Sequence, residues 1–270
     1  MNIDWLTLLL KLLLVPTFIG LVSLAGRRWG ATVSGWLIGL PFSSGPVAFI
    51  LALEQGVEFA SQASQAIMLG IVSDYAFCVA YSWVAIRRGW LESTLAGATA
   101  FFVATFILNM LSLSLWVETA FAILALLVSL YLLPRVGSDR SSPELTQWEL
   151  PLRMAAATIL VFLLTSLATL LGPQLTGLLT PFPIFVTTMG VFTHRSQGGQ
   201  EAVKLIRGVI IGTLSFIIFF LILSSTLVAL GLGFSFLAAI AATLLMHLTS
   251  LQLLRSKSRL LKPRAAEPFG

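Results

Sequence analysis

The sequence predicts an all-α polytopic membrane protein of nine transmembrane helices, arranged as two four-helix units on either side of a linking helix. Three observations lead to this fold class: the composition, a series of apolar runs of spanning length, and a repeat within the chain. The 270 residues are 57% hydrophobic and only 10% charged, whereas soluble domains carry about 25% charged residues. Mean hydropathy is +0.97. The chain is therefore expected to be an integral membrane protein with no room for a soluble catalytic domain.

Apolar runs long enough to cross a bilayer, which takes about 20 residues each, divide the chain into nine predicted spans. They cover residues 5–25, 32–53, 60–86, 93–112, 116–134, 151–171, 174–193, 202–230 and 234–254. The first run carries Asp4 and no basic flank before it, so we expect an uncleaved first helix. The fourth and fifth spans must turn within "LNMLSLSLWVETA" (108–120), which contains no strong helix breaker.

Basic residues lie in alternate loops, and this asymmetry predicts the orientation of the chain. The loops of one side, with the C-terminal tail, hold Arg27, Arg28, Arg87, Arg88, Arg135, Arg140, Arg195, Arg255, Lys257, Arg259, Lys262 and Arg264. The loops of the other side hold no lysine or arginine. Because basic loops mark the cytoplasmic face, we expect the N-terminus outside and the C-terminus inside a cell inner (plasma) membrane, the bacterial inner membrane. The net charge of +5 then reflects these loops, and we expect no nucleic-acid partner.

A shift of 142 residues aligns the two halves of the chain without a gap. Gly30 aligns with Gly172, Pro41 with Pro183, Gln55-Gly56 with Gln197-Gly198, and Gly70 with Gly212. Glycine and proline matches carry weight because both residue types occur where backbone geometry is special. Four crossings return the chain to its starting side, and the fifth delivers the second unit upside down. The prediction is a 4+1+4 inverted repeat: 1–112 first repeat, 113–150 linking helix and cytoplasmic loop, 151–254 second repeat, and 255–270 basic tail.

Two aligned segments, "GWLIGLPFSSGPVAF" (35–49) and "TGLLTPFPIFVTTMG" (176–190), place proline and glycine inside predicted spans. Proline breaks a helix, and broken backbone inside a bilayer is tolerated only where it is buried in protein or lines a wet cavity. We therefore expect the two breaks to form a binding site for a small solute near mid-membrane. The candidate residues are Pro41, Ser43, Ser44, Gly45, Thr180, Pro183, Thr187 and Thr188. In the alternative interpretation, the prolines only bend the helices for packing.

Asp74 lies near the middle of the third predicted span, in "GIVSDYAFCVAY", and aligns with Phe216. An acid at that depth costs at least a few kcal/mol and is by default a functional hypothesis. A protonatable acid in an apolar bundle suits proton coupling, whereas the alternative is a neutral carboxyl group hydrogen-bonded for packing. Lys11, about two turns into the first span, either extends to the membrane surface or supplies a counter-charge to Asp74 or to an anionic substrate.

Part of each half resembles a known family. Gly177-Leu178-Leu179, Phe182-Pro183-Ile184-Phe185 and Gly198 resemble the core of the GlpM family of small four-helix inner-membrane proteins. The first half resembles it more loosely, through Gly35, Pro41 and Gly56-Val57-Glu58, and lacks the second phenylalanine. The resemblance implies that each half is one such unit and that the linking helix fuses them. It implies no particular activity.

Signatures of catalysis are missing from the sequence, which contains no HExxH, no GxSxG and no phosphate-binding loop. We therefore expect no enzyme, no cofactor and no metal site. His247 is interpreted as a hydrogen-bonded packing residue, with a proton relay as the alternative, and Glu118 as a solvated residue at an outer helix end. The favoured function is a small secondary transporter with Asp74 as the candidate for proton coupling. The alternative is a membrane scaffold or assembly protein that binds lipid or a partner protein. Substrate, direction and oligomeric state are left open.

Overall fold

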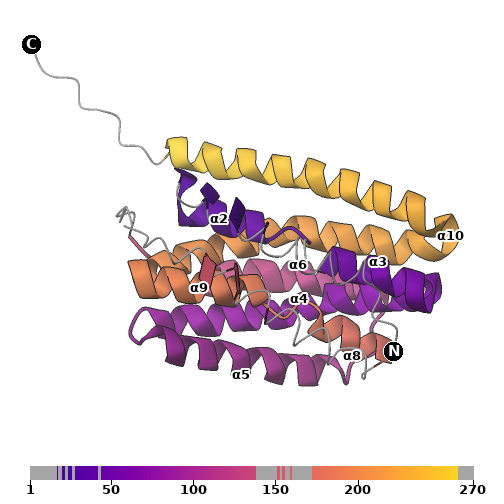
Figure 1. The fold of residues 1–270 in the computed structure, drawn as a ribbon, viewed down its shortest axis with the longest axis horizontal. Coiled ribbons are helices and arrows are strands. Elements are labelled where there is room, and N and C mark those ends of the chain that lie inside the picture. The colour runs from indigo at the N-terminus through magenta and orange to yellow at the C-terminus, as the bar shows by residue number, and fades with distance from the viewer. Residues whose placement is uncertain are drawn as a thin grey trace, which may run out of the picture.

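The computed structural model describes residues 28–41, 44–137 and 172–260, with single residues and pairs between 17 and 25 and between 151 and 159. Every regular element in these residues is an α-helix, which confirms the all-α class. The helices are α2 (Ala31–Ile38), α3 (Ser44–Gln55), α4 (Val57–Ala85), α5 (Trp90–Leu108), α6 (Leu115–Leu132), α8 (Gly172–Leu179), α9 (Ile184–Gln197) and α10 (Gly199–Leu260). They form one elongated bundle (Figure 1).

The long helices are apolar enough to cross a membrane. Four stretches of the described chain have the required length and composition: Val57–Ala85, Trp90–Leu108, Leu115–Leu132 and Gly199–Thr249. The chain is thus a membrane-embedded protein. The predicted spans 5–25 and 151–171 lie largely outside the described residues, so the nine-helix layout is not confirmed and stays a prediction.

Gly231 divides α10 into a first limb, residues 199–230, and a second limb, residues 232–260. Its backbone has φ 75° and ψ 174°, and Figure 1 shows α10 turning back on itself at this end of the bundle. The sequence placed a span boundary at 230–234, which agrees with this break. The expected turn between the fourth and fifth spans is also present, because α5 ends at Leu108 and α6 begins at Leu115.

The predicted interruptions are present in both halves. The first separates α2 from α3 and the second separates α8 from α9. At each break a proline carbonyl restarts the helix: Gly45 N–H donates to Pro41 at 2.8 Å, and Thr187 N–H donates to Pro183 at 2.7 Å. Both donor and acceptor differ by 142 residues between the two bonds. The two halves therefore repeat the break as well as the sequence around it.

Each interrupted helix packs on the opposite half of the chain. A Cβ atom added to Gly35 of α2 would overlap the carbonyl oxygen of Leu205 on α10, so the two backbones are in direct contact. A Cβ atom added to Gly177 of α8 would lie 2.6 Å from the carbonyl oxygen of Ala63 on α4. The two glycines are 142 residues apart, and so are Ala63 and Leu205, the residues that they contact. The two halves are thus interlocked, because a glycine of each half contacts the backbone of the equivalent helix in the other half. Small residues such as glycine allow helices to approach this closely.

The equivalent helices α4 and the first limb of α10 run in opposite directions. The Tyr75 hydroxyl lies 2.8 Å from that of Thr213, and the Ser61 hydroxyl donates to the Ser224 carbonyl at 2.8 Å. Residue numbers therefore increase along α4 while they decrease along the facing part of α10. Both helices follow a glycine in a conformation that other residues rarely adopt, Gly56 at φ 89° and Gly198 at φ 90°. This antiparallel pair forms the centre on which the interrupted helices pack.

Candidate functional site

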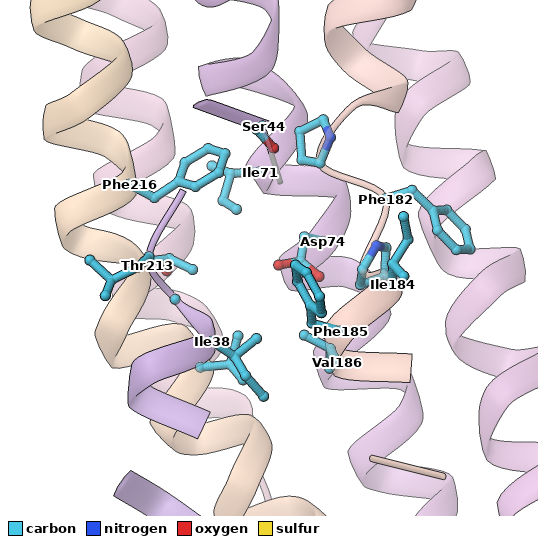
Figure 2. Close-up of a pocket in the computed structure, with 15 residues that line it drawn as sticks. Ile38, Ser44, Ile71, Asp74, Phe182, Ile184, Phe185, Val186, Thr213 and Phe216 are labelled. Carbon is cyan, nitrogen blue, oxygen red and sulfur yellow. The ribbon is translucent and has the colours of Figure 1, made fainter. Parts of the chain in front are cut away.

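A cavity of about 40 Å³ lies between the two helix breaks. Its walls come from both breaks and from the two central helices, α4 and α10 (Figure 2). The lining residues are Ile38, Gly39, Leu40, Ser44, Ile71, Asp74, Pro181, Phe182, Pro183, Ile184, Phe185, Val186, Val209, Thr213 and Phe216. The structure therefore brings the two interrupted segments together around one space, although they are far apart in the chain.

The cavity lies where helix ends of both polarities converge. The C-terminal end of α2, the residues Pro181 and Phe182 that follow α8, and the N-terminal ends of α3 and α9 all border it. Helix C-termini present carbonyl groups and a partial negative charge, whereas N-termini present N–H groups and a partial positive charge. The breaks thus provide backbone polar groups inside a bundle whose side chains are mostly apolar.

Asp74 is the charged residue of this site. The 29-residue helix α4 places it, at 1.5 Å per residue, about 26 Å from one helix end and about 17 Å from the other. Its side chain is only 4% exposed. Its carboxylate accepts a weak hydrogen bond from the Cys78 thiol at 3.8 Å and makes no ion pair with any residue that the structure describes. A carboxylate without a counter-ion is costly in such a place, so Asp74 is suited to binding a proton or a cation.

Ser44 is the first residue of α3 and is 1% exposed. Its hydroxyl oxygen has no hydrogen-bond partner among the described residues. Buried polar groups normally find a partner, and most serines inside helices bond back to the chain. Figure 2 shows Ser44 at the same space as Asp74. The cavity therefore contains an acid and an unsatisfied hydroxyl group.

Thr213, on α10, is a lining residue that the sequence analysis missed. Its hydroxyl donates to the Ile210 carbonyl at 2.7 Å, so the hydrogen of the 2.8 Å contact with Tyr75 comes from the tyrosine. One lone pair of the Thr213 oxygen is left for a further donor or a cation. Its alignment in the repeat could have indicated it, because Thr213 is polar whereas the aligned residue of the first half, Ile71, is apolar.

The predicted solute-binding residues divide into three groups. Ser44 and Pro183 line the cavity, as does the predicted coupling residue Asp74. Pro41, Gly45, Thr180, Thr187 and Thr188 do not line it, although all belong to the two broken segments. Ser43 and Lys11 lie outside the described residues. The positions of Thr187 and Thr188 have a local reason: α9 begins at Ile184, and its first three residues form the wall of the cavity.

Polar residues away from the cavity have structural partners. His247 stacks on Trp36, with ring centroids 3.7 Å apart, and its Nδ1 lies 2.9 Å from the Ser215 hydroxyl, in agreement with a packing role. Glu118 is 5% exposed, so the expectation of a solvated residue is wrong. In the described part of the chain, no group of three histidine, cysteine or acidic residues could hold a metal ion.

His194 lies at the end of α9, beyond the predicted seventh span. Its Nδ1 is 3.2 Å from the Tyr81 hydroxyl, and burial lowers the pKa of the imidazole from its usual value. A lowered pKa favours the neutral ring at neutral pH. His194 therefore adds no charge to this end of the bundle.

The chain matches no protein-family model, and no curated protein or solved structure is significantly similar to it. The resemblance to the GlpM family stays an expectation.

Proposed function

We propose that the protein is a small secondary transporter whose transported species reach a site between the two interrupted helices. The single observation that carries the proposal is the convergence of two equivalent helix breaks around a buried cavity that contains Asp74. Secondary transporters commonly bind substrate and coupling ions where discontinuous helices meet at the bilayer midplane. A membrane-embedded acid that makes no ion pair with the described residues fits such a site, because it can exchange a proton with each side in turn.

The full architecture proposed is the 4+1+4 inverted repeat of nine spans, with the C-terminus in the cytoplasm of the bacterial cell. The antiparallel course of α4 and the first limb of α10, taken with the 142-residue spacing of their contacts, supports it. In an inverted repeat each half can adopt the conformation of the other. That exchange would open the site alternately to the two sides of the membrane.

The described conformation corresponds to a closed state in this mechanism. Ser44 is 1% exposed and Asp74 is 4% exposed. Access would require one interrupted pair, α2 with α3 or α8 with α9, to move against the antiparallel core. The glycine contacts at Gly35 and Gly177 place backbone against backbone, which leaves few side chains to rearrange when the helices slide.

The alternative, a scaffold or assembly protein that binds lipid or a partner, predicts a dry centre and openings toward the lipid. The cavity, whose wall contains a buried acid and an unsatisfied hydroxyl group, favours transport. The deciding measurement is solute uptake into proteoliposomes. Candidate solutes are those that raise the melting temperature of the purified protein, since a ligand selective for the folded state stabilises it.

Asp74→Asn is the informative variant because asparagine keeps the shape but cannot release a proton. We expect pH-gradient-driven uptake to fall at least tenfold, with solute binding retained. Glu118→Gln is the matched control: it removes another buried acid, outside the cavity, and should leave uptake unchanged. Full uptake by Asp74→Asn would exclude Asp74 as the coupling residue. Failure of every stabilising solute to enter wild-type vesicles would favour the scaffold.

A further inference from the structure

The size of the cavity limits what it can hold. Pockets for organic ligands have volumes of about 300–1,000 Å³, far above the 40 Å³ between the breaks. A single water needs about 10–15 Å³ on a comparable measure. A cavity of this volume has room for a small ion with one or two waters, and not for an organic solute.

The charge of the walls selects a cation. Among the described lining residues, Asp74 is charged and none is lysine, arginine or histidine. An anion would meet the carboxylate with no basic side chain from the described part of the chain to offset it. A calcium ion usually takes six to eight oxygen ligands, including several carboxylates, and one acid supplies only one negative charge. A monovalent cation matches the single charge of Asp74.

The oxygen atoms around the cavity are of the kind that a small hard cation prefers. Asp74 supplies a carboxylate, Ser44 a hydroxyl oxygen without a partner, and Thr213 an oxygen with one unused lone pair. These three side chains come from α4, α3 and α10 and surround the same space (Figure 2). Convergence from three elements makes this a built site and not a single polar helix end.

The helix breaks add backbone groups to the wall of the cavity. Gly39 lines the cavity without a side chain, so it contributes only main-chain atoms. Pro41 has no N–H and cannot serve as a helical donor to the carbonyl groups of the preceding turn. Unwound carbonyls and the negative C-terminal ends of half-helices coordinate sodium in transporters of the inverted-repeat type. The C-terminal end of α2 reaches this cavity, as do Pro181 and Phe182 of the unwound segment after α8.

We propose that the cavity binds one sodium ion between Asp74, Ser44 and Thr213, and that this ion is coupled to solute movement. The coupling to solute movement rests on the proposed function, whereas the binding of sodium does not depend on it. Sodium binds only when the carboxyl group of Asp74 is deprotonated, so a sodium ion and a proton compete for Asp74. No other ionisable group lines the cavity among the described residues. Cys78 approaches from the same helix at 3.8 Å, and the Tyr75 hydroxyl is turned to Thr213.

The test of binding is thermal unfolding of the purified full chain in detergent at pH 8. Sodium chloride, lithium chloride or potassium chloride replaces choline chloride at constant ionic strength, and equilibrium binding of radioactive sodium gives the Kd. We expect saturable stabilisation by sodium, weaker by potassium, with one sodium per chain. Equal melting in sodium and choline, or binding of sodium with no saturation, would overturn the site.

Variants locate the ion. Asp74→Asn should abolish sodium binding, and Ser44→Ala should weaken it at least tenfold. The matched control is Ser64→Ala, since Ser64 is fully buried and its hydroxyl has no partner in the described chain, yet it lies outside the cavity. Should Asp74→Asn fail to fold, Ser44→Ala and Thr213→Val carry the test. Sodium binding of wild-type strength in both would overturn the assignment.

Binding and transport fail separately. Uptake driven by a pH gradient in a protein that binds no sodium would remove the sodium site and leave the proposed transporter. In the converse outcome, the protein binds sodium, Asp74→Asn abolishes this binding, and no solute is transported. That result would support the sodium site and would exclude both the transporter function and the coupling of sodium to solute movement.

Discussion

The hydroxyl group of Tyr75 donates to that of Thr213 across a distance of 2.8 Å, one residue along α4 from Asp74. This bond joins the two antiparallel core helices beside the cavity, and both side chains are buried. Hydrogen bonds between membrane helices contribute about 0.6 kcal/mol on average and up to about 1.7 kcal/mol. The Tyr75–Thr213 pair should lie in the upper half of that range, because both partners have little access to water.

A double-mutant cycle tests this bond. Tyr75→Phe and Thr213→Val should each destabilise the protein, and the coupling between them should be about 1 kcal/mol. The free energy of unfolding is measured by denaturant titration in micelles. Tyr131→Phe is the control, because Tyr131 is 84% exposed and should change stability by less than about 0.5 kcal/mol. Additive effects of the two variants would mean that the bond is not formed in the membrane protein.

Gly35→Ala and Gly177→Ala should destabilise the fold to a similar degree. The new methyl group would meet backbone of α10 in the first case and of α4 in the second, and overpacking costs about 1–3 kcal/mol. Gly233→Ala is the control, since no atom lies within 4 Å of its added Cβ. It should be neutral or slightly stabilising, because alanine favours helix more than glycine does. A destabilised Gly35→Ala beside a fully stable Gly177→Ala would contradict the matched interlocking of the halves.

Pro41→Ala and Pro183→Ala should each allow a more continuous helix through a break. The restored N–H can join the helical hydrogen-bond ladder, which would narrow the cavity. We expect solute uptake and sodium binding to fall at least tenfold while the yield of folded protein falls less. Pro134→Ala is the control, because it retains the carbonyl group that accepts a hydrogen bond from Arg207 at 3.1 Å. Equal loss of yield with normal specific activity would leave a packing role for the prolines.

Cys78 is the single cysteine of the chain, and it reports access to Asp74 without any engineered label. Its thiol is fully buried and lies 3.8 Å from the Asp74 carboxylate. N-ethylmaleimide should therefore label the resting protein slowly and label it at least tenfold faster during transport, when the site opens. Labelling in SDS sets the maximum. A rate that is the same at rest and during transport would show that the opening does not reach this turn of α4.

Reporter fusions test the orientation. Fusions after residues 29, 89, 140 and 260 should read cytoplasmic, and those after 56, 114 and 232 should read external, because basic loops remain inside. Gly56 and Gly198 begin equivalent helices that run in opposite directions. A fusion after 198 should therefore read cytoplasmic. An external signal there would remove the inverted relation between the halves.

Much of the helical organisation could be predicted because its determinants are local. Proline inside a helix and glycine at positive φ interrupt the helical backbone, so the breaks after Ile38 and Leu179 and the bend at Gly231 follow from local residues. The 142-residue spacing then predicts that both halves share these breaks. Gly56 and Gly198 confirm this in their backbone angles.

The walls of the cavity were harder to predict because they depend on which face of each helix turns inward. Around Thr213, residues 209–223 of α10 are apolar apart from Gly212, Thr213 and Ser215, so periodicity does not single out the face that carries Thr213. The hydroxyl groups of Thr187 and Thr188 favour a place in the site, yet α9 begins at Ile184 and its first turn forms the cavity wall. Comparing aligned positions of opposite polarity, such as Thr213 with Ile71, would have improved the prediction.

During biosynthesis, α2 enters the membrane long before the surface on which it packs. Gly35 contacts Leu205 of α10, and that part of the chain leaves the ribosome only after most of the protein has been made. The complementary surface on α4, around Ala63, likewise stays without its partner until Gly177 of α8 arrives. Neither half can complete its packing alone. Two halves produced as separate polypeptides should therefore be degraded when made singly and protected when made in the same cell.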